Sequence, residues 1–386
     1  MHPTRFTNLP QARARFGDRV DRLGPWLLRV DTPADAVVRV IKDMPKGVGW
    51  EQFTQAAARG VVNVPGAPAE MRAFFAETES VPPWVDWATL DRGGRVLMRT
   101  GLLGGLVLGL SSLPHGYASP GGNKPLILSG RMNEQAVRRL NETARFVQAV
   151  CRAGGQRPGA DGYQITLRVR LMHAQVRQML LASGKWDTAA WGQPINQHDM
   201  AATTLLFSLV LLDGVRKLGA SILEEDAEAY MQLWRYTGLL MGVEPAILPT
   251  GEAEGRRLAD LIRATTAPAD ADGRSLTRAL LTAPLALART PRDRRIVEKR
   301  IEFTKAMCRE LLGNELADQL GVERTSWRVT VPFVKRIVRA AERVRGSIPG
   351  ADRTALAQGT RYWDRVVEIG LAGATAEFGL PERLAA

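Results

Sequence analysis

Four long helical patterns in the middle of the chain limit the folds that it can adopt. Apolar residues recur at helical spacing over residues 133–151, 162–183, 199–218 and 224–241, and glycine, proline or a capping residue stands at their boundaries. Alternating apolar and polar residues, which indicate strands, occur only in short isolated pieces. The sequence therefore predicts an all-α fold in which these helices pack as one bundle.

The first hundred residues contain shorter helical patterns that prolines interrupt. We predict an irregular N-terminal extension over residues 1–45 and a single all-α domain over residues 46–386, because no linker rich in proline, glycine or serine divides the remainder. The longest apolar run, residues 101–113, is short and glycine-rich for a membrane span, which needs about 20 apolar residues. It predicts a buried helix whose glycines let a neighbouring helix or a flat cofactor approach closely.

The charge balance restricts the partners of the chain. There are 52 Lys and Arg against 40 Asp and Glu, a formal net charge of +12, which suits nucleic acid or an anionic membrane. The arginines alternate with acids in amphipathic helices and form no stripe with aromatic residues, so we expect no nucleic-acid partner. Membrane contact is compatible with the charge but is not predicted from it. The N-terminal residues lack the apolar core of a secretory signal, and the expected location is cytoplasmic.

The helix over residues 162–183 carries the most informative side chain, His173. It stands among apolar residues, with Arg170 and Arg177 three and four positions away on the same face. A neutral imidazole beside cations suits a haem, because the iron takes one axial nitrogen and the two propionates bind guanidinium groups. The alternative is a core histidine hydrogen-bonded to a carbonyl group, which is common for a lone histidine.

Other kinds of site find less support in the sequence. There is no Gly-rich phosphate loop, no His-Glu-x-x-His motif and no Cys-x-x-Cys motif. Four histidines supply a multi-histidine metal site poorly, whereas a haem needs one. Arg139, Glu142 and Thr143 occupy positions i, i+3 and i+4 of a helix, so a cation, a carboxylate and a hydroxyl share one face. A solvated ion pair beside a helical threonine would produce the same pattern.

Six short motifs, in this order, resemble the rubber-oxygenase catalytic domain shared by latex-clearing proteins and the oxygenase of mycophenolic acid biosynthesis. The resemblance runs over about residues 50–249 and is weaker beyond them. The motifs are Val81-Pro-Pro-Trp-Val-Asp86, Tyr117-Ala-Ser-Pro120, Ser129-Gly-Arg-Met132 with Arg139-x-x-x-Thr143, Arg170-Leu-Met-His173-Ala-x-Val-Arg177, Gly192-Gln-Pro-Ile-Asn-Gln-His-Asp199 and Leu233-Trp-Arg-Tyr-Thr-Gly238.

This resemblance implies a globin-like helical bundle that encloses a non-covalently bound haem b. The family's iron ligand matches His173, its distal arginine and threonine match Arg139 and Thr143, and the arginines beside its proximal histidine match Arg170 and Arg177. The predicted catalytic and cofactor-binding residues are therefore those that the helical spacing already brings together.

The chain departs from the family pattern in the charges of the distal pocket. Latex-clearing proteins carry a lysine directly before the distal threonine, where this chain has Glu142. They also carry an upstream glutamate, where this chain offers Asn123 or Lys124. Glu142 is therefore predicted to act as a base or a gate.

Together these observations predict a haem b-dependent oxygenase. It would act with O2 on an apolar substrate, of the isoprenoid or alkene kind, with oxidative cleavage of a carbon–carbon double bond as the reaction that the family suggests. A haem-binding sensor or carrier without turnover is the alternative, and a basic helical protein resting on an anionic membrane is a third hypothesis that depends on net charge alone.

Overall fold

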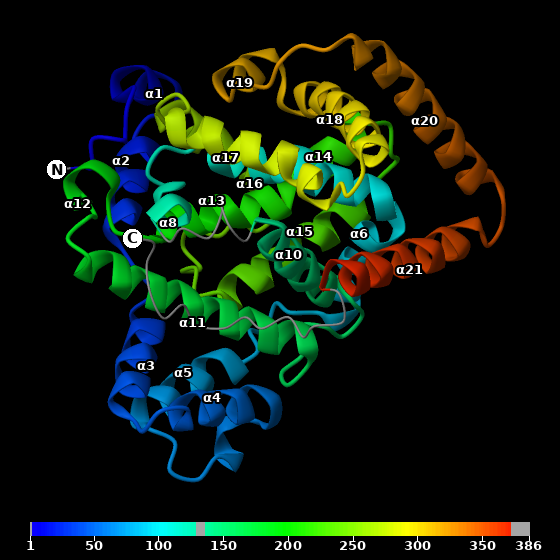
Figure 1. The fold of residues 1–386 in the computed structure, drawn as a ribbon. Coiled ribbons are helices and arrows are strands. Elements are labelled where there is room, and N and C mark those ends of the chain that lie inside the picture. Colours follow the sequence, from blue (N-terminus) through cyan, green and yellow to red (C-terminus); the bar gives the residue numbers. More distant parts are fainter. Residues whose placement is uncertain (1, 129–135, 372–386) are drawn as a thin grey trace.

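The computed structural model describes residues 2–128 and 136–371, and helices account for nearly all of the ordered elements in them (Figure 1). No β-strand occurs in this part of the chain, where Phe6 and Thr266 form an isolated bridge. The prediction of an all-α fold is confirmed. The N-terminal elements are α1 (Leu9–Phe16), α2 (Arg19–Leu23), η1 (Gly24–Leu28), α3 (Thr32–Asp43), α4 (Val48–Arg59), η2 (Val61–Asn63) and α5 (Ala69–Glu79).

The central elements carry most of the core. They are α6 (Trp87–Val107), η3 (Leu108–Ser112), α7 (Leu113–Tyr117), α8 (Lys124–Leu128), α10 (Ala136–Cys151), α11 (Asp161–Ala182), α12 (Thr188–Trp191), α13 (Gln197–Phe207), α14 (Leu209–Lys217), α15 (Glu224–Leu240), α16 (Glu252–Thr265) and α17 (Ala271–Thr282). The C-terminal elements are η4 (Ala283–Leu287), α18 (Pro291–Leu312), α19 (Asn314–Gln319), η5 (Ser326–Thr330), α20 (Val331–Ser347) and α21 (Ala351–Leu371).

Helix α6 is the element around which the others pack. It lies against α15, α21 and α10, and small residues permit the close contacts. A Cβ atom at Gly93 would overlap the backbone of Ala229 in α15, and one at Gly94 would overlap the backbone of Cys151 in α10. The sequence predicted that glycines near residue 101 admit a neighbouring helix, and Gly101 indeed lies against α21.

Gly101 also bends α6. Its φ of 45° lies in the left-handed region that favours glycine, and it interrupts the helical geometry of α6. The chain then continues through η3, a single π-helical turn, into α7. Bends and π-turns of this kind redirect a helix without ending it. The residues that follow the bend, around α7, form one wall of the cavity described below.

The N-terminal residues belong to the same core as the rest of the chain. Val20, Leu27 and Val37 are almost completely buried in the main hydrophobic cluster. Helix α3 packs on α11, and α3, α4 and α5 gather at one end of the molecule (Figure 1). Residues on both sides of position 45 therefore share one core, and the predicted division at residue 45 stays a prediction.

Caps fix the start of several helices. Asp31, Asp86 and Asn196 accept hydrogen bonds from the first turns of α3, α6 and α13, and Thr290 forms a reciprocal capping box with Asp293 at α18. The Asn196 side chain accepts the Asp199 N–H at 2.9 Å. This cap places Asp199 in the first turn of α13, where it reaches the cavity.

Two helical segments, Trp87–Tyr117 and Gln197–Lys217, are long and apolar enough to cross a membrane. Half of the most apolar window of the first, and 61% of that of the second, is buried inside the structure. Core helices with apolar residues on most of their faces have the same composition. Length and composition alone are therefore weak evidence for a membrane span in these segments.

Candidate functional site

An apolar cavity lies between α7, α10, α11, α13 and α15. Its volume is about 310 Å³, which falls at the lower end of the range of about 300–1,000 Å³ that is typical of small-molecule sites. Most of its wall is apolar, and the polar side chains that reach it are few. These polar groups are Ser112, Tyr117, Glu142, Thr143, His173, Asp199, Thr203, Thr204 and Thr237.

His173 reaches the cavity from α11. Its helical neighbours Val169, Met172 and Val176 line the same wall, so the imidazole stands in an apolar surrounding. His115 and His198 are two of the other histidines of the chain, and neither is among the lining residues that the structure describes. His115 instead donates from Nδ1 to the Ser111 carbonyl at 2.9 Å, and burial lowers its pKa. The structure thus brings His173, and neither of these two histidines, to the cavity.

Helix α10 supplies two more of the predicted site residues. Glu142 and Thr143 both line the cavity. The Glu142 carboxylate accepts a hydrogen bond from Arg138 Nε at 3.1 Å, an i, i+4 pair whose arginine is half exposed. Arg139 lies in the same helix, but its side chain is outside the described part of the structure. Its predicted role toward bound oxygen stays a prediction.

Asp199 is a second carboxylate in the cavity wall, and the sequence analysis did not single it out. Nη2 of Arg5 lies 2.7 Å from both of its oxygens, and Asn196 donates to it at 2.9 Å. His198 Nδ1 stands 3.3 Å away. Burial raises the pKa of this carboxyl, but the guanidinium of Arg5 and the contact with His198 outweigh burial and lower the pKa to about 2. Asp199 is therefore ionised at neutral pH.

Arg170 was predicted to contact the cofactor, but the structure gives it another partner. It is 2% exposed and binds Asp31 of the N-terminal region through Nε at 2.7 Å and Nη2 at 2.9 Å. Nη2 also donates to Glu77 at 3.1 Å, and the guanidinium lies over the ring of Phe74 at 4.6 Å. Arg170 does not line the cavity. Its charge holds α11 to α3 and α5 and is not directed at the site.

Arg177, the second predicted cofactor arginine, is also directed away from the cavity. It forms an ion pair with Asp35 in α3 at 2.5 Å, and it donates to the carbonyls of Pro194 and Ile195 at 3.1 and 3.2 Å. Ile195 lines the cavity and has a φ of 52°, a left-handed conformation that is rare for a β-branched residue. Arg177 therefore shapes the wall indirectly, because it holds the strained loop that carries Ile195.

Lys124, a residue near the predicted distal charges, is also held away from the cavity interior. Its Nζ pairs with Asp270 at 2.7 Å and with Asp272. The neighbouring Asn123 donates its side-chain amide to Asp270 at 2.9 Å. These contacts fix α8 to the start of α17, and they leave Pro125 and Leu126 of α8 in the cavity wall.

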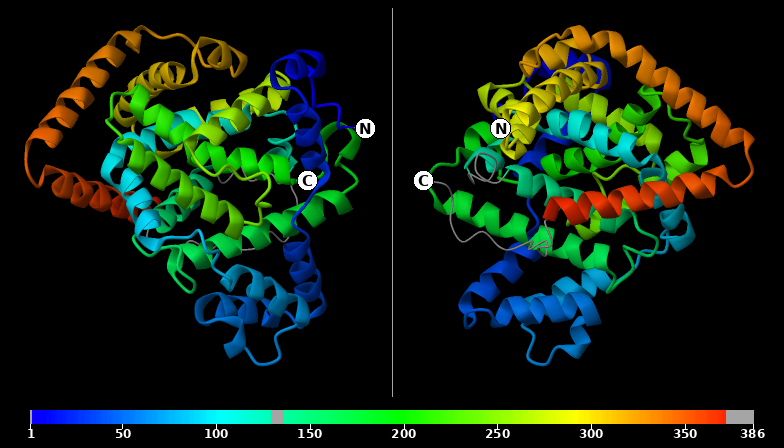
Figure 2. Two further views of the ribbon diagram at one scale, coloured as in Figure 1. Left: turned by 180° about the vertical axis from the view of Figure 1, so that it is seen from behind. Right: turned by 45° about the vertical axis from the view of Figure 1, so that its right-hand side comes forward.

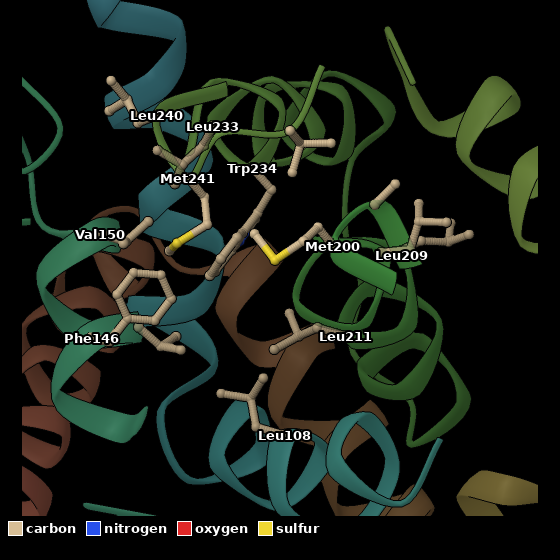
Figure 3. Close-up of a cluster of buried hydrophobic side chains, with 14 of the residues drawn as sticks. Leu108, Phe146, Val150, Met200, Leu209, Leu211, Leu233, Trp234, Leu240 and Met241 are labelled. Atoms are coloured by element: carbon tan, nitrogen blue, oxygen red, sulfur yellow. The ribbon is translucent and has the colours of Figure 1, made fainter. Parts of the chain in front are cut away.

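Aromatic and sulfur side chains form another part of the cavity wall. Figure 3 shows four of them, Phe146, Met200, Trp234 and Met241, in one cluster of buried side chains. Phe207 stacks on Trp234 with ring centres 5.0 Å apart and an angle of 13°, and Phe146 meets Trp234 edge-on at 6.0 Å. Met200 and Met241 lie beside them. Flat aromatic faces and flexible thioethers suit a large apolar ligand. Trp234 belongs to the motif at residues 233–238, but the sequence did not show which side chains this motif contacts.

The described residues contain no cluster of three or more His, Cys, Asp or Glu that could hold a metal ion. The two cysteines, Cys151 and Cys308, are free and buried.

The comparisons with known proteins point to oxygenases. Residues 94–346 match the family described as ER-bound oxygenase mpaB/B'/Rubber oxygenase, catalytic domain. The Rubber oxygenase of a Streptomyces species is 25% identical over 324 residues, which cover 80% of this chain and 76% of that protein. The structure of Latex Clearing Protein in the closed state aligns with a TM-score of 0.70 at 22% identity, over 89% of this chain and 91% of that one.

The family match extends over more than half of the chain and includes α10, α11, α13 and α15, which enclose the cavity. The all-α fold is shared with the latex-clearing protein. The resemblance read from the six motifs is confirmed, and the chain belongs to the mpaB and rubber-oxygenase family of oxygenases.

Proposed function

We propose that the protein is a haem b-dependent oxygenase that uses O2 to cleave a carbon–carbon double bond in an apolar alkene or isoprenoid substrate. The observation that carries the proposal is the position of His173, which stands on the wall of an apolar cavity in a chain of an oxygenase family. Haem iron takes an imidazole nitrogen as an axial ligand, and His173 is placed to offer one.

The residues around the cavity offer two things that a haem needs, an axial ligand and an apolar surface. His173 offers one nitrogen ligand, and Val169, Met172 and Val176 offer an apolar surface beside it. The lining residues that the structure describes include no lysine or arginine. Arg139 therefore remains the candidate for a positively charged group at the cavity, since α10 carries it next to Glu142 and Thr143.

A bound haem would supply the iron at which dioxygen is activated. His173 would hold it from α11. The Thr143 hydroxyl would donate a hydrogen bond to dioxygen from α10, and the Glu142 carboxylate would accept or release a proton at its Oε atoms. The stacked rings of Phe207 and Trp234 would hold the alkene and keep water away from it.

The proposed reaction needs no external electrons. One C=C bond and one O2 molecule give two carbonyl groups, so both oxygen atoms enter the products. The four electrons that reduce O2 come from the two bonds of the cleaved alkene.

The first test is haem binding by the purified protein, followed by absorption spectroscopy and the pyridine haemochrome assay. We expect a b-type spectrum in the wild type. Loss of a residue that hydrogen-bonds to a metal ligand weakens metal binding by roughly 10–100-fold. His173→Ala removes the ligand itself, so it should weaken haem binding by more than this. His115→Ala is the matched control, a partly buried histidine that is not among the lining residues, and should keep the haem. An unchanged haem content in His173→Ala would remove His173 as the ligand.

The second test separates turnover from simple haem binding. Squalene and its saturated analogue squalane differ only in their double bonds, so O2 uptake and formation of carbonyl products should occur with squalene alone. Thr143→Val, which keeps the shape but removes the hydroxyl, should retain haem and slow O2 uptake roughly 10–100-fold or more. Haem binding without O2 uptake on squalene or a polyisoprene emulsion would favour the sensor or carrier.

A further inference from the structure

The outer face of α20 exposes a continuous apolar stripe. Val329, Phe333, Ile337, Val344 and Ile348 follow one another at intervals of four, four, seven and four residues, a spacing that puts them on one side of a helix. Between 54% and 68% of each side chain is exposed. The helix and the turns at its two ends thus present about five turns of uncovered apolar surface.

The packing of α20 does not require this stripe. The helix already buries its opposite face, where Val331, Val334 and Val338 pack against the core. Lys335 pairs with Glu310 on that side, and Glu342 pairs with Arg345. A helix that packs by one face normally turns a polar face to water. Here the outer face is apolar as well, so a second surface is expected to cover it.

Three arginines border the stripe along one edge. Arg336, Arg339 and Arg343 are spaced by three and four residues, and all three are exposed. None of them forms an ion pair with any residue that the structure describes, and Arg336 lies 5.9 Å from the centre of the Phe333 ring. The sequence from residue 331 to 348 contains one acid, Glu342, and it faces inward. The stripe and its arginine edge are called the α20 face below.

The α20 face is accessible from outside the molecule. Helix α20 runs along the outer edge of the fold in each of the views, between η5 and α21 (Figures 1 and 2). Among the described elements, α20 makes its main contacts with α18 and with the flanking η5 and α21. A flat surface could therefore reach the whole length of the helix.

We propose that the α20 face docks the protein on an anionic membrane surface. The apolar side chains would enter the boundary between headgroups and acyl chains, and the arginines would contact the lipid phosphates. The net charge of +12 adds a long-range attraction to the same surface. This inference does not depend on the haem or on the reaction.

A membrane explains the α20 face better than a second copy of the chain does. Two copies paired through this face would place six arginines beside an interface that contains no carboxylate to neutralise them. Anionic lipid supplies negative charge along the whole edge and needs no complementary shape. The mixture of an apolar stripe and arginines is typical of helices that lie in the membrane interface.

The experiment is sedimentation of the full-length protein with vesicles at several salt concentrations. We expect binding to vesicles of phosphatidylcholine and phosphatidylglycerol, weaker binding as salt increases, and little binding to phosphatidylcholine alone. Replacing Arg336, Arg339 and Arg343 by glutamine should weaken binding by roughly 100-fold, from the attraction of three cations near an anionic surface. The double variant Phe333→Asp, Ile337→Asp should weaken it by at least roughly tenfold.

Two control variants test whether vesicle binding depends on the α20 face, or instead on net charge or on exposed apolar residues elsewhere. Arg19→Gln, Arg22→Gln, Arg59→Gln removes three exposed arginines on α2 and α4. Val62→Asp changes an 88% exposed residue of η2. Both controls should bind vesicles nearly as well as the wild type. An equal loss in the arginine control would overturn the proposal, because binding would then follow net charge alone.

A fluorescent label tests insertion directly. Cys151 and Cys308 are buried, so Ile337→Cys can be labelled with an environment-sensitive dye. Its emission should shift to the blue on anionic vesicles, and the same dye at Val62→Cys should not respond. No shift at residue 337, or a dimer in sedimentation velocity that Phe333→Asp, Ile337→Asp converts to monomer, would contradict membrane docking. The second result would identify another copy as the occupant.

Discussion

Replacing Arg5 by alanine removes a buried ion pair from the cavity wall. Only 7% of the Arg5 side chain and 17% of the Asp199 side chain are exposed. The guanidinium lies 2.7 Å from both carboxylate oxygens. In Arg5→Ala, Asp199 would keep its contacts with Asn196 and His198 but would lose the guanidinium that lies closest to it. A negative charge would then remain at a mostly buried position.

The lowered pKa of Asp199 gives the size of the stability loss expected in Arg5→Ala. Burial alone would raise it, yet Arg5 and His198 bring it from 3.8 to about 2. At about 1.4 kcal/mol per pKa unit, this corresponds to about 2.5 kcal/mol of stability at pH 7. Loss of one partner from a fully buried pair costs about 3–5 kcal/mol. Because Asp199 keeps other partners, we expect Arg5→Ala to lower the free energy of unfolding by about 2–3 kcal/mol.

The assay is a double-mutant cycle with Asp199→Asn, followed by guanidinium chloride unfolding at pH 7. The coupling free energy between the two positions should be about 2 kcal/mol. The folded-state pKa of Asp199 is lowered, so its stabilising contribution is complete above pH 4 and is lost as the pH falls from about 4 to about 2. The penalty of Arg5→Ala should therefore shrink across that interval.

An exposed pair provides the control for this cycle. Arg13 also donates to Asp21 at 2.7 Å, but about half of each side chain is exposed. Water screens such a pair, so Arg13→Ala should leave the stability unchanged within error. If Arg5→Ala and Asp199→Asn had additive effects on the free energy of unfolding, the reasoning would be refuted, because the ion pair would then contribute nothing to stability.

Three further predictions follow from the packing and from the cavity. Arg170→Ala should lower the free energy of unfolding, measured with denaturant, by about 3–5 kcal/mol. The haem affinity of the folded protein should not change. A selective loss of haem would instead support the predicted contact between Arg170 and the cofactor. Gly359→Ala should lower the melting temperature, because its Cβ would overlap the Met98 carbonyl oxygen where α21 crosses α6. Glu142→Gln should keep haem and stability but alter the pH profile of O2 uptake, and an identical profile would exclude a proton-transfer role.

The helical fold was predictable because its signals are local. Helical spacing of apolar residues, glycine and proline at the boundaries, and caps such as Asn196 all act within a few residues of each other. The same local signal brought Glu142 and Thr143 together on α10, and both line the cavity. The contribution of the first 45 residues was less predictable, because their short helices gain stability mainly from contacts with distant segments such as α11.

Asp199 shows why part of the site could not be read from the sequence. Its partner Arg5 is 194 positions away in the chain and stands outside the six motifs. Backbone hydrogen bonds from Thr4 and Arg5 to Ala189 and Ala190 hold the N-terminal segment there. No periodicity relates these positions, so only the folded structure shows that an ion pair closes this part of the wall.

The geometry of α11 explains why His173 lines the cavity whereas the two predicted arginines, Arg170 and Arg177, do not. At 100° per residue, Val169 and Val176 lie on one side of His173, and Arg170 and Arg177 lie on the other. Proximity to His173 in sequence therefore does not mean a shared environment. The valine side faces the cavity, whereas the arginine side faces α3, where Asp31 and Asp35 neutralise the two charges. His173 stands at the border of the two sides, so buried ion pairs behind it fix the helix that presents its imidazole to the cavity.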